Sequence, residues 1–224
     1  MGFFYSAGNW SLRRTLWAFA DYSVSGRERV PRDGPLIVVA NHQSNMDPPL
    51  LAASIPRRLK FLAKAEIFDR RWAGFLLNAW GAFPVRRGEA DRRAYEWLLA
   101  VLAEPTGAVA LFPEGTRTPG SMGRAKRGIA TVAVRSRAPL LPVGLTGTET
   151  MSHYLRVFNP TGTIRVTIGE PFAVRADWAP ASQDDLDTLT MEVMARIARL
   201  LPESYRGVYR DAAGAEFTVT QGLD

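Results

Sequence analysis

The hydrophobic pattern of the chain alternates between short apolar runs and longer segments with helical spacing. The apolar runs have the length and composition of buried strands, and they cover residues 36–40, 59–63, 83–85, 108–112, 140–145 and 164–168. Segments of helical periodicity lie between or after them, at 49–55, 71–80, 91–103, 129–137 and 182–201. This alternation predicts a single α/β domain, with a mixed, largely parallel sheet flanked by helices.

A further helix is predicted over residues 10–22, before the first strand. Its apolar positions recur at helical spacing, at Leu12, Leu16, Phe19 and Ala20. The charged residues on the other side are Arg13, Arg14 and Asp21, and Trp10 and Trp17 border the apolar face. Such a helix suits the headgroup layer of a membrane. A helix that simply covers the core is the open alternative. The segment predicts an amphipathic interface region over residues 1–25 and a main domain over 26–224.

No segment is apolar enough to predict a membrane span. The longest stretch without a charged residue is 72–85, which has 14 residues. A helix needs roughly 18–20 apolar residues to cross a bilayer. Any membrane association is therefore expected to be peripheral or monotopic.

The charge balance points to a polyanionic partner. The chain of 224 residues carries 28 Lys and Arg against 22 Asp and Glu, a net charge of +6. Residues 1–137 have a net charge of +10 and residues 138–224 one of −4, so the excess is concentrated in the first part. Nucleic acid, an anionic membrane and a phosphorylated substrate all fit such an excess. No basic–aromatic module of nucleic-acid readers is found, so we expect no nucleic-acid partner.

The residue inventory excludes several kinds of site. The chain has no Cys, which rules out structural disulfides, a thiolate nucleophile and Cys-ligated metals. It has two His, too few for a His-rich metal centre, and we expect no metal. A Gly-x-Ser-x-Gly nucleophile elbow is also missing.

His42 and Asp47 form the first candidate site. They lie in Asn41-His42-Gln43-Ser44-Asn45-Met46-Asp47-Pro48, just after the strand at 36–40, and strand carboxyl ends are where α/β folds place their sites. His is the side chain best suited to proton transfer near neutral pH, and a carboxylate can fix its tautomer. Without a protein nucleophile, such a pair would activate a hydroxyl of the substrate. A turn in which Asp47 only caps the next helix is the alternative.

Two more polar segments follow predicted strands. Phe112-Pro113-Glu114-Gly115-Thr116-Arg117 combines a glycine with a carboxylate and a guanidinium that binds anions. Gly81-Ala82-Phe83-Pro84-Val85-Arg86-Arg87-Gly88 is a strand that ends in two arginines. Solvated turns are the alternative for both.

Taken in order, these segments resemble the lysophosphatidic acid acyltransferase (1-acylglycerol-3-phosphate acyltransferase) family and its glycerolipid acyltransferase relatives. The segment at 41–48 resembles the first family motif, His-x4-Asp, the one at 81–88 the second and the one at 112–117 the third. Phe61-Leu62-Ala63-Lys64-Ala65-Glu66 resembles the segment whose lysine contacts the acceptor phosphate, and Leu140-Leu141-Pro142-Val143-Gly144-Leu145 the fourth motif. The resemblance covers about 26–147 and makes residues 26–224 the expected catalytic domain.

The resemblance implies a direct acyl transfer. His42, oriented by Asp47, would deprotonate the hydroxyl of a lysophospholipid, which attacks the thioester of acyl-CoA or an acyl carrier protein. Lys64, Arg87 and Arg117 would hold the acceptor phosphate, with Glu114 and Gly115 in the same site. The product would be phosphatidic acid, with no cofactor beyond the acyl donor. An anionic membrane surface, at the cytoplasmic face, is the expected place of work.

Two other functions stay open on the sequence. The same chemistry could serve glycerol-3-phosphate, another lysophospholipid, or a glycolipid hydroxyl. The second alternative is of another functional class: a non-catalytic basic module that binds membranes. Replacement of His42 discriminates that class, because a binding module does not need a base.

Overall fold

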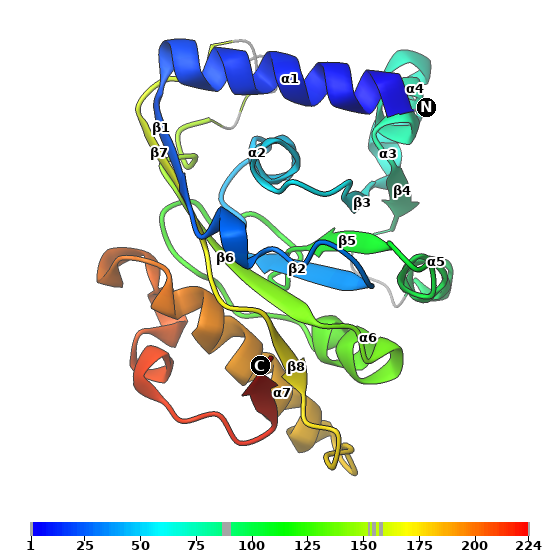
Figure 1. The fold of residues 1–224 in the computed structure, drawn as a ribbon, viewed down its shortest axis with the longest axis vertical. Helices are drawn as coiled ribbons and strands as arrows, with labels where there is room; N and C mark the ends of the chain where they lie inside the picture. The colour runs from blue at the N-terminus through cyan, green and yellow to red at the C-terminus, as the bar shows by residue number, and fades with distance from the viewer. Residues whose placement is uncertain (1, 87–90, 152, 154–155, 157–158, 224) are drawn as a thin grey trace.

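A mixed β-sheet runs through the centre of the molecule (Figure 1). The computed structural model describes residues 2–86, 91–151, 153, 156 and 159–223. The strands of the sheet are β1 (Asp21–Ser25), β2 (Leu36–Ala40), β3 (Lys60–Lys64), β4 (Ala82–Val85), β5 (Ala108–Leu111), β6 (Leu140–Thr146), β7 (Thr163–Ile168), β8 (Phe172–Val174) and β9 (Thr220–Gly222). Their order is β1-β7-β6-β2-β5-β3-β4, with β8 paired to β6 and to β9.

Five neighbouring strands are parallel to one another. β6, β2, β5, β3 and β4 form this group, so their carboxyl ends lie at one edge of the sheet. β7 runs antiparallel to β6, β1 runs parallel to β7, and β8 and β9 add further antiparallel pairs. The predicted α/β fold with a mixed, largely parallel sheet is confirmed.

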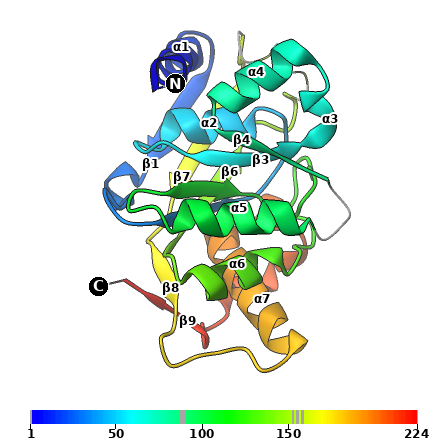
Figure 2. The same ribbon diagram turned by 90° about the vertical axis from the view of Figure 1, so that its right-hand side faces the viewer.

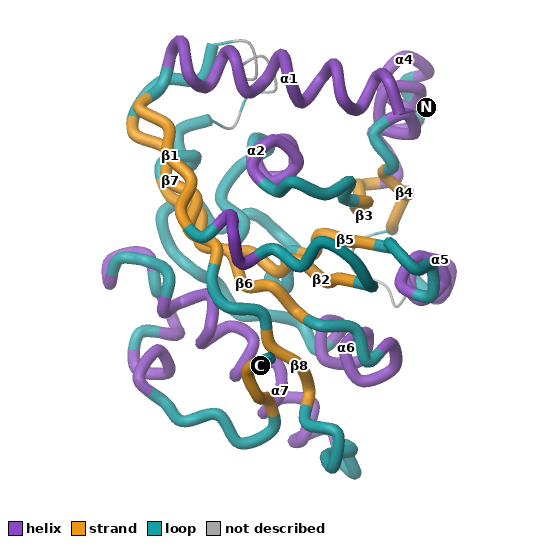
Figure 3. The backbone as a smooth tube through the Cα atoms, viewed as in Figure 1, coloured by secondary structure: helices purple, strands orange, loops and turns teal. Residues whose placement is uncertain are grey.

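Helices cover both faces of the sheet (Figure 2). They are α1 (Gly2–Phe19), α2 (Asp47–Ser54), α3 (Ala65–Phe68), α4 (Arg71–Ala79), α5 (Arg92–Leu102), α6 (Gly128–Ser136) and α7 (Gln183–Arg199). Figure 3 shows α1, α2 and α4 above the strands and α6 and α7 below them. Each layer buries its own apolar core: α1 and α2 share one with the sheet, and α5, α6 and α7 share the other.

The apolar run of β2 is buried on both sides, which explains why it shows no alternation. Leu36, Val38 and Ala40 face the core under α1 and α2. Ile37 and Val39 face the core over α5, α6 and α7. A strand between two helix layers needs apolar side chains at every position.

The predicted helices and strands are found with shifts of one or two residues at most ends. The α7 start is capped as the sequence indicates: the Ser182 hydroxyl accepts from the Asp185 N–H, and the Asp185 side chain accepts in return from the backbone of Ser182. The sequence pattern does not predict β1, β8 and β9, because each has only three to five residues and none contains a long apolar run. After α7 the chain forms short 3-10 turns, at Glu203–Tyr205, Gly207–Tyr209 and Asp211–Gly214, before β9.

The first helix differs from the prediction in its bounds and in the face it buries. It ends at Phe19, and Asp21 and Tyr22 belong to β1 instead, which pairs with β7 inside the sheet. Leu12 and Leu16 are buried in the core beside α2 rather than presented outward. The exposed surface of α1 carries Trp10 and Trp17, which are 61% and 79% exposed.

None of the helices in the described part of the chain has both the length and the apolar character needed to cross a bilayer.

Candidate active site

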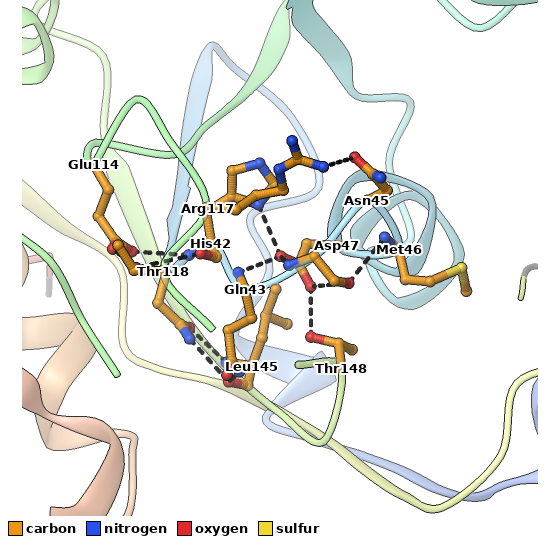
Figure 4. Close-up of polar contacts among 12 residues, drawn as sticks. His42, Gln43, Asn45, Met46, Asp47, Glu114, Arg117, Thr118, Leu145 and Thr148 are labelled. Carbon is orange, nitrogen blue, oxygen red and sulfur yellow. Dashed lines mark hydrogen bonds and ion pairs between the residues drawn. The ribbon is translucent and has the colours of Figure 1, made fainter. Parts of the chain in front are cut away.

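The loop from β2 to α2 holds His42 against Asp47. The Nδ1 atom of His42 lies 2.8 Å from Oδ2 of Asp47, and both residues are buried, at 5% and 0% exposure (Figure 4). Asp47 is the first residue of α2, and Pro48 and Pro49 follow it in the first turn, where proline is well tolerated. The bond at Nδ1 leaves Nε2 as the ring nitrogen available for proton transfer.

Asp47 is held by several hydrogen-bond donors. The backbone N–H groups of Gln43 and Ser44 donate to Oδ2 at 2.6 and 2.7 Å. The hydroxyl of Thr148 donates to the other oxygen, Oδ1, at 2.6 Å. Asp47 therefore does more than begin α2: its carboxylate ties the loop to its own helix and to the end of β6, and it aims one oxygen at His42.

The loop after β5 lies beside the His42 loop. The backbone N–H of Thr118 donates to the carbonyl of His42 at 2.7 Å. The ring of His42 stacks on Phe112, with centroids 4.2 Å apart and planes 24° apart. The motifs at 41–48 and 112–117 therefore meet in space, as expected for loops that follow adjacent parallel strands.

Glu114 connects these two loops from the inside. Its Oε1 accepts the backbone N–H of His42 at 2.9 Å, and its Oε2 accepts the N–H of Gly123 at 2.8 Å and the hydroxyl of Thr118. The residue is 2% exposed, and burial raises the pKa of its carboxyl above the ordinary value, although the hydrogen bonds from Thr118, Gly123 and His42 oppose this. This carboxylate therefore accepts from the backbone of His42 and has almost no exposure to solvent.

Gly115 makes the turn that follows Glu114. Its φ of 68° is in the left-handed region, and its N–H donates to the carbonyl of Phe112 at 3.0 Å. An added Cβ would lie 3.1 Å from the Cε of Lys126, so the site also packs closely against this lysine.

Two of the predicted phosphate ligands, Arg117 and Lys64, follow neighbouring strands at the same sheet edge. Arg117 is exposed, and its Nη1 donates to Oδ1 of Asn45 at 2.6 Å, next to the His42 loop. Lys64 ends β3, is exposed, and has its Nζ 3.2 Å from Oε1 of Glu66. Arg87 lies outside the described residues, whereas Arg86 just before it is exposed after β4.

The neighbouring polar residues were not predicted as part of the site. Asn41 exchanges two hydrogen bonds with the backbone of Leu145, at 2.9 and 2.8 Å. Gln43 donates to the carbonyl of Leu145 at 2.6 Å and accepts the N–H of Gly120 at 3.0 Å. Thr148 joins Asp47 from beyond β6. No local pattern in the sequence indicates these contacts, because they depend on the strand order that places β5 and β6 beside β2.

A known family matches the part of the chain that carries this site. The family model described as Acyltransferase matches residues 21–146, more than half of the chain. The chain belongs to this acyltransferase family. The match contains both His42 and Asp47, and it begins at β1. The resemblance inferred from the motifs is thus confirmed.

The relatives of this acyltransferase are named as lysolipid acyltransferases. The chain is 30% identical over 179 residues to the 1-acyl-sn-glycerol-3-phosphate acyltransferase of Bacillus subtilis, and the match covers 79% of this chain and 86% of the relative. It is 36% identical over 140 residues to the lyso-ornithine lipid O-acyltransferase of Pseudomonas aeruginosa, covering 61% and 52%. The crystal structure of the 1-acyl-sn-glycerophosphate (LPA) acyltransferase PlsC of Thermotoga maritima matches with a TM-score of 0.65 at 30% identity, over 84% of this chain and 76% of that one.

Proposed function

We propose that the protein transfers a fatty acyl group from a thioester to the free hydroxyl of 1-acylglycerol-3-phosphate, giving phosphatidic acid. The observation that carries the proposal is the buried His42–Asp47 pair, 2.8 Å apart, in a chain of the acyltransferase family. The names of the relatives from Bacillus subtilis and Thermotoga maritima support this acceptor.

In the proposed mechanism, His42 is the general base. Its Nε2 takes the proton of the acceptor hydroxyl, while Asp47 fixes the Nδ1–H tautomer and stabilises the imidazolium that forms. The oxygen attacks the thioester carbonyl, and the tetrahedral intermediate collapses with the carbon–sulfur bond broken. His42 then returns its proton to the leaving thiolate. The absence of Cys from the chain fits a direct transfer without a thiol acyl-enzyme.

We propose that exposed cations at the sheet edge of His42 bind the acceptor phosphate. Lys64 ends β3, Arg117 lies in the loop after the neighbouring strand β5, and Arg87 is a third candidate on sequence. Gly115 allows the close turn beside them. We assign Glu114 to positioning the His42 backbone instead, because a buried carboxylate engaged by three donors repels a phosphate rather than binding it.

The acyl donor in this proposal is acyl-CoA or an acyl carrier protein, since both present a thioester. No cofactor or metal takes part: the base is an imidazole and the electrophile is already activated. Asp184, Asp185 and Asp187 lie in the first turns of α7, where acidic residues complement the helix dipole, and Asp185 caps the helix while Asp187 pairs with Arg127.

In this proposal the protein is bound peripherally to an anionic membrane surface, at the cytoplasmic face of the membrane. The support is the exposed face of α1, where Trp10 and Trp17 accompany Arg13 and Arg14. Aromatic side chains next to basic ones favour the headgroup layer. In this proposal the Trp face of α1 contacts the membrane, in place of the Leu12 face named from the sequence, because Leu12 is buried in the core.

A lyso-ornithine lipid is the second candidate acceptor. The relative of that name from Pseudomonas aeruginosa is 36% identical over 140 residues, which favours it over glycerol-3-phosphate or a glycolipid. The chemistry would be unchanged, because both acceptors present a free hydroxyl.

One assay tests the proposal. Purified protein receives labelled acyl-CoA or acyl carrier protein, with 1-acylglycerol-3-phosphate, lyso-ornithine lipid and glycerol-3-phosphate as separate acceptors. We expect phosphatidic acid to form fastest, and the rate to fall to background with His42→Ala. Equal product from wild type and His42→Ala refutes the catalytic role. A membrane-binding module without activity would produce no labelled lipid from any acceptor.

A further inference from the structure

Thr148 is a buried hydroxyl that touches the catalytic pair from outside the recognised motifs. It is fully buried, and its Oγ1 donates to Oδ1 of Asp47 at 2.6 Å. We propose that Thr148 is a positioning residue: it fixes the rotation of the Asp47 carboxylate so that Oδ2 stays aimed at Nδ1 of His42. This inference rests on the proposed function.

The other short hydrogen bonds of Asp47 all reach the same oxygen. His42, Gln43 and Ser44 all approach Oδ2, and a carboxyl group rotates softly about its terminal bond. Apart from Thr148, the described residues offer Oδ1 only the Ser44 hydroxyl, at 3.4 Å. Among the described residues, Thr148 therefore provides the one short bond to the far oxygen, and with it the carboxylate is held at both oxygens (Figure 4).

The fold aims Thr148 at Asp47 through a turn at the end of β6. β6 lies beside β2, with Val143 opposite Ala40, so the segments after the two strands leave the same sheet edge. Gly147 has a φ of 85°, and an added Cβ there would lie 1.9 Å from the carbonyl oxygen of Thr163. The turn is closed by the N–H of Met151, which donates to the carbonyl of Thr148 at 2.8 Å. The backbone that carries the hydroxyl is thus fixed on both sides.

The expected consequence is a loss in turnover without a loss in substrate binding. Thr148 contacts Asp47 and has no role in holding either substrate in the proposed mechanism. If Asp47 rotates, the imidazolium that forms in the transition state loses its partner, while the bound ground state is unchanged. Such a change lowers kcat and leaves the KM of both substrates near its wild-type value.

The test compares Thr148→Val, which keeps the shape and removes the hydroxyl, with Thr148→Ser, which keeps the hydroxyl. We expect Thr148→Val to lower kcat by ~10- to 100-fold, the order expected for a misaligned catalytic group, with KM changed less than about twofold. Thr148→Ser should stay within about threefold of wild type. Thr190→Val is the matched control: Thr190 is also buried, but its hydroxyl donates to Leu186 within α7.

A double-mutant cycle separates positioning from general stability. In an Asp47→Asn background, Thr148→Val should lower the residual kcat far less than it does in wild type, because the group it positions is already neutral. Thr148→Ala repeats the measurement if the valine variant does not fold. Wild-type kcat in the folded valine or alanine variant, equal losses in the serine and valine variants, or additive losses in the cycle would overturn the inference. These outcomes require an active wild type, so they are distinct from a failure of the proposed function.

Discussion

The backbone N–H of His42 donates a 2.9 Å hydrogen bond to Oε1 of Glu114, so residues 72 positions apart in sequence share one buried contact. Through its other oxygen, Glu114 holds the N–H of Gly123 and the hydroxyl of Thr118. One carboxylate thus fixes the loop that carries His42 and the loop that carries Arg117 relative to each other.

Replacing this carboxylate should cost both stability and turnover. In Glu114→Gln, one acceptor oxygen becomes an NH₂ group that must face a backbone N–H. An unsatisfied buried donor costs about 1–3 kcal/mol, which urea unfolding measures. Displacement of the His42 loop should also lower kcat. Glu104→Gln, at an exposed carboxylate that pairs with Lys60, is the control and should change neither quantity. Unchanged unfolding in Glu114→Gln would contradict the role.

The raised pKa of Glu114 also predicts a pH dependence of stability. Because burial raises its pKa above 4.5, the folded state binds more protons than the unfolded state between pH 4.5 and the raised value. Its contribution to the free energy of unfolding therefore falls as the pH rises through that window. Unfolding of wild type and Glu114→Gln from pH 4.5 to 8 measures this, since Gln does not titrate. We expect the difference in the free energy of unfolding between wild type and Glu114→Gln to shrink with rising pH and then level off. A difference that stays constant or grows would contradict the raised pKa of Glu114.

Asp47→Asn should leave a folded protein with little activity. An amide oxygen can still accept from the backbone of Gln43 and Ser44, and the Thr148 hydroxyl can turn to accept from the NH₂ group. The negative charge that stabilises the imidazolium is lost. We expect kcat to fall by ~10²- to 10⁴-fold with little change in acceptor KM, because Asp47 does not bind the acceptor. Steady-state kinetics and a melting curve measure the two effects. Activity close to wild type would refute His42 as the base that Asp47 supports.

Arg117→Ala should act on the acceptor rather than on turnover. A phosphate clamp binds the ground state and the transition state alike, so its loss raises KM. We expect an increase of about tenfold for the phosphate-bearing acceptor, in line with one charge-assisted pair. The KM of the acyl donor should stay constant. Arg92→Ala, on an exposed arginine of α5 paired with Glu96, is the matched control. An acceptor KM that does not respond to Arg117→Ala would remove this arginine from the site.

The exposed face of α1 should carry membrane binding. The double variant Trp10→Ser with Trp17→Ser removes two exposed aromatic rings, and Arg14 lies over one of them, 5.3 Å from the Trp10 centroid. We expect binding to vesicles with anionic lipid to weaken by about tenfold or more. Met191→Ser with Val208→Ser is the control, since these exposed apolar residues lie in the other helix layer and beyond it. Vesicle sedimentation that is equal for both double variants would refute α1 as the contact.

The sequence by itself determined what depends on neighbouring residues. The apolar runs located most of the strands, because a strand between two helix layers is apolar throughout. The Ser182 cap located the start of α7, since its partner Asp185 is three residues away. The pairing of His42 with Asp47 is also local, because the intervening loop brings them together within six residues. Order along the chain was enough for the family resemblance.

Only the tertiary structure decided the contacts that join distant segments. It turned Glu114 toward the backbone of His42, and it brought Thr148 to Asp47 across 101 positions. It also buried the Leu12 side of α1 and left the tryptophans outside. The physical reason is that these contacts depend on strand order and on the direction of turns such as that at Gly147. The periodicity of a segment reports which residues share a face, but not which other segment that face meets.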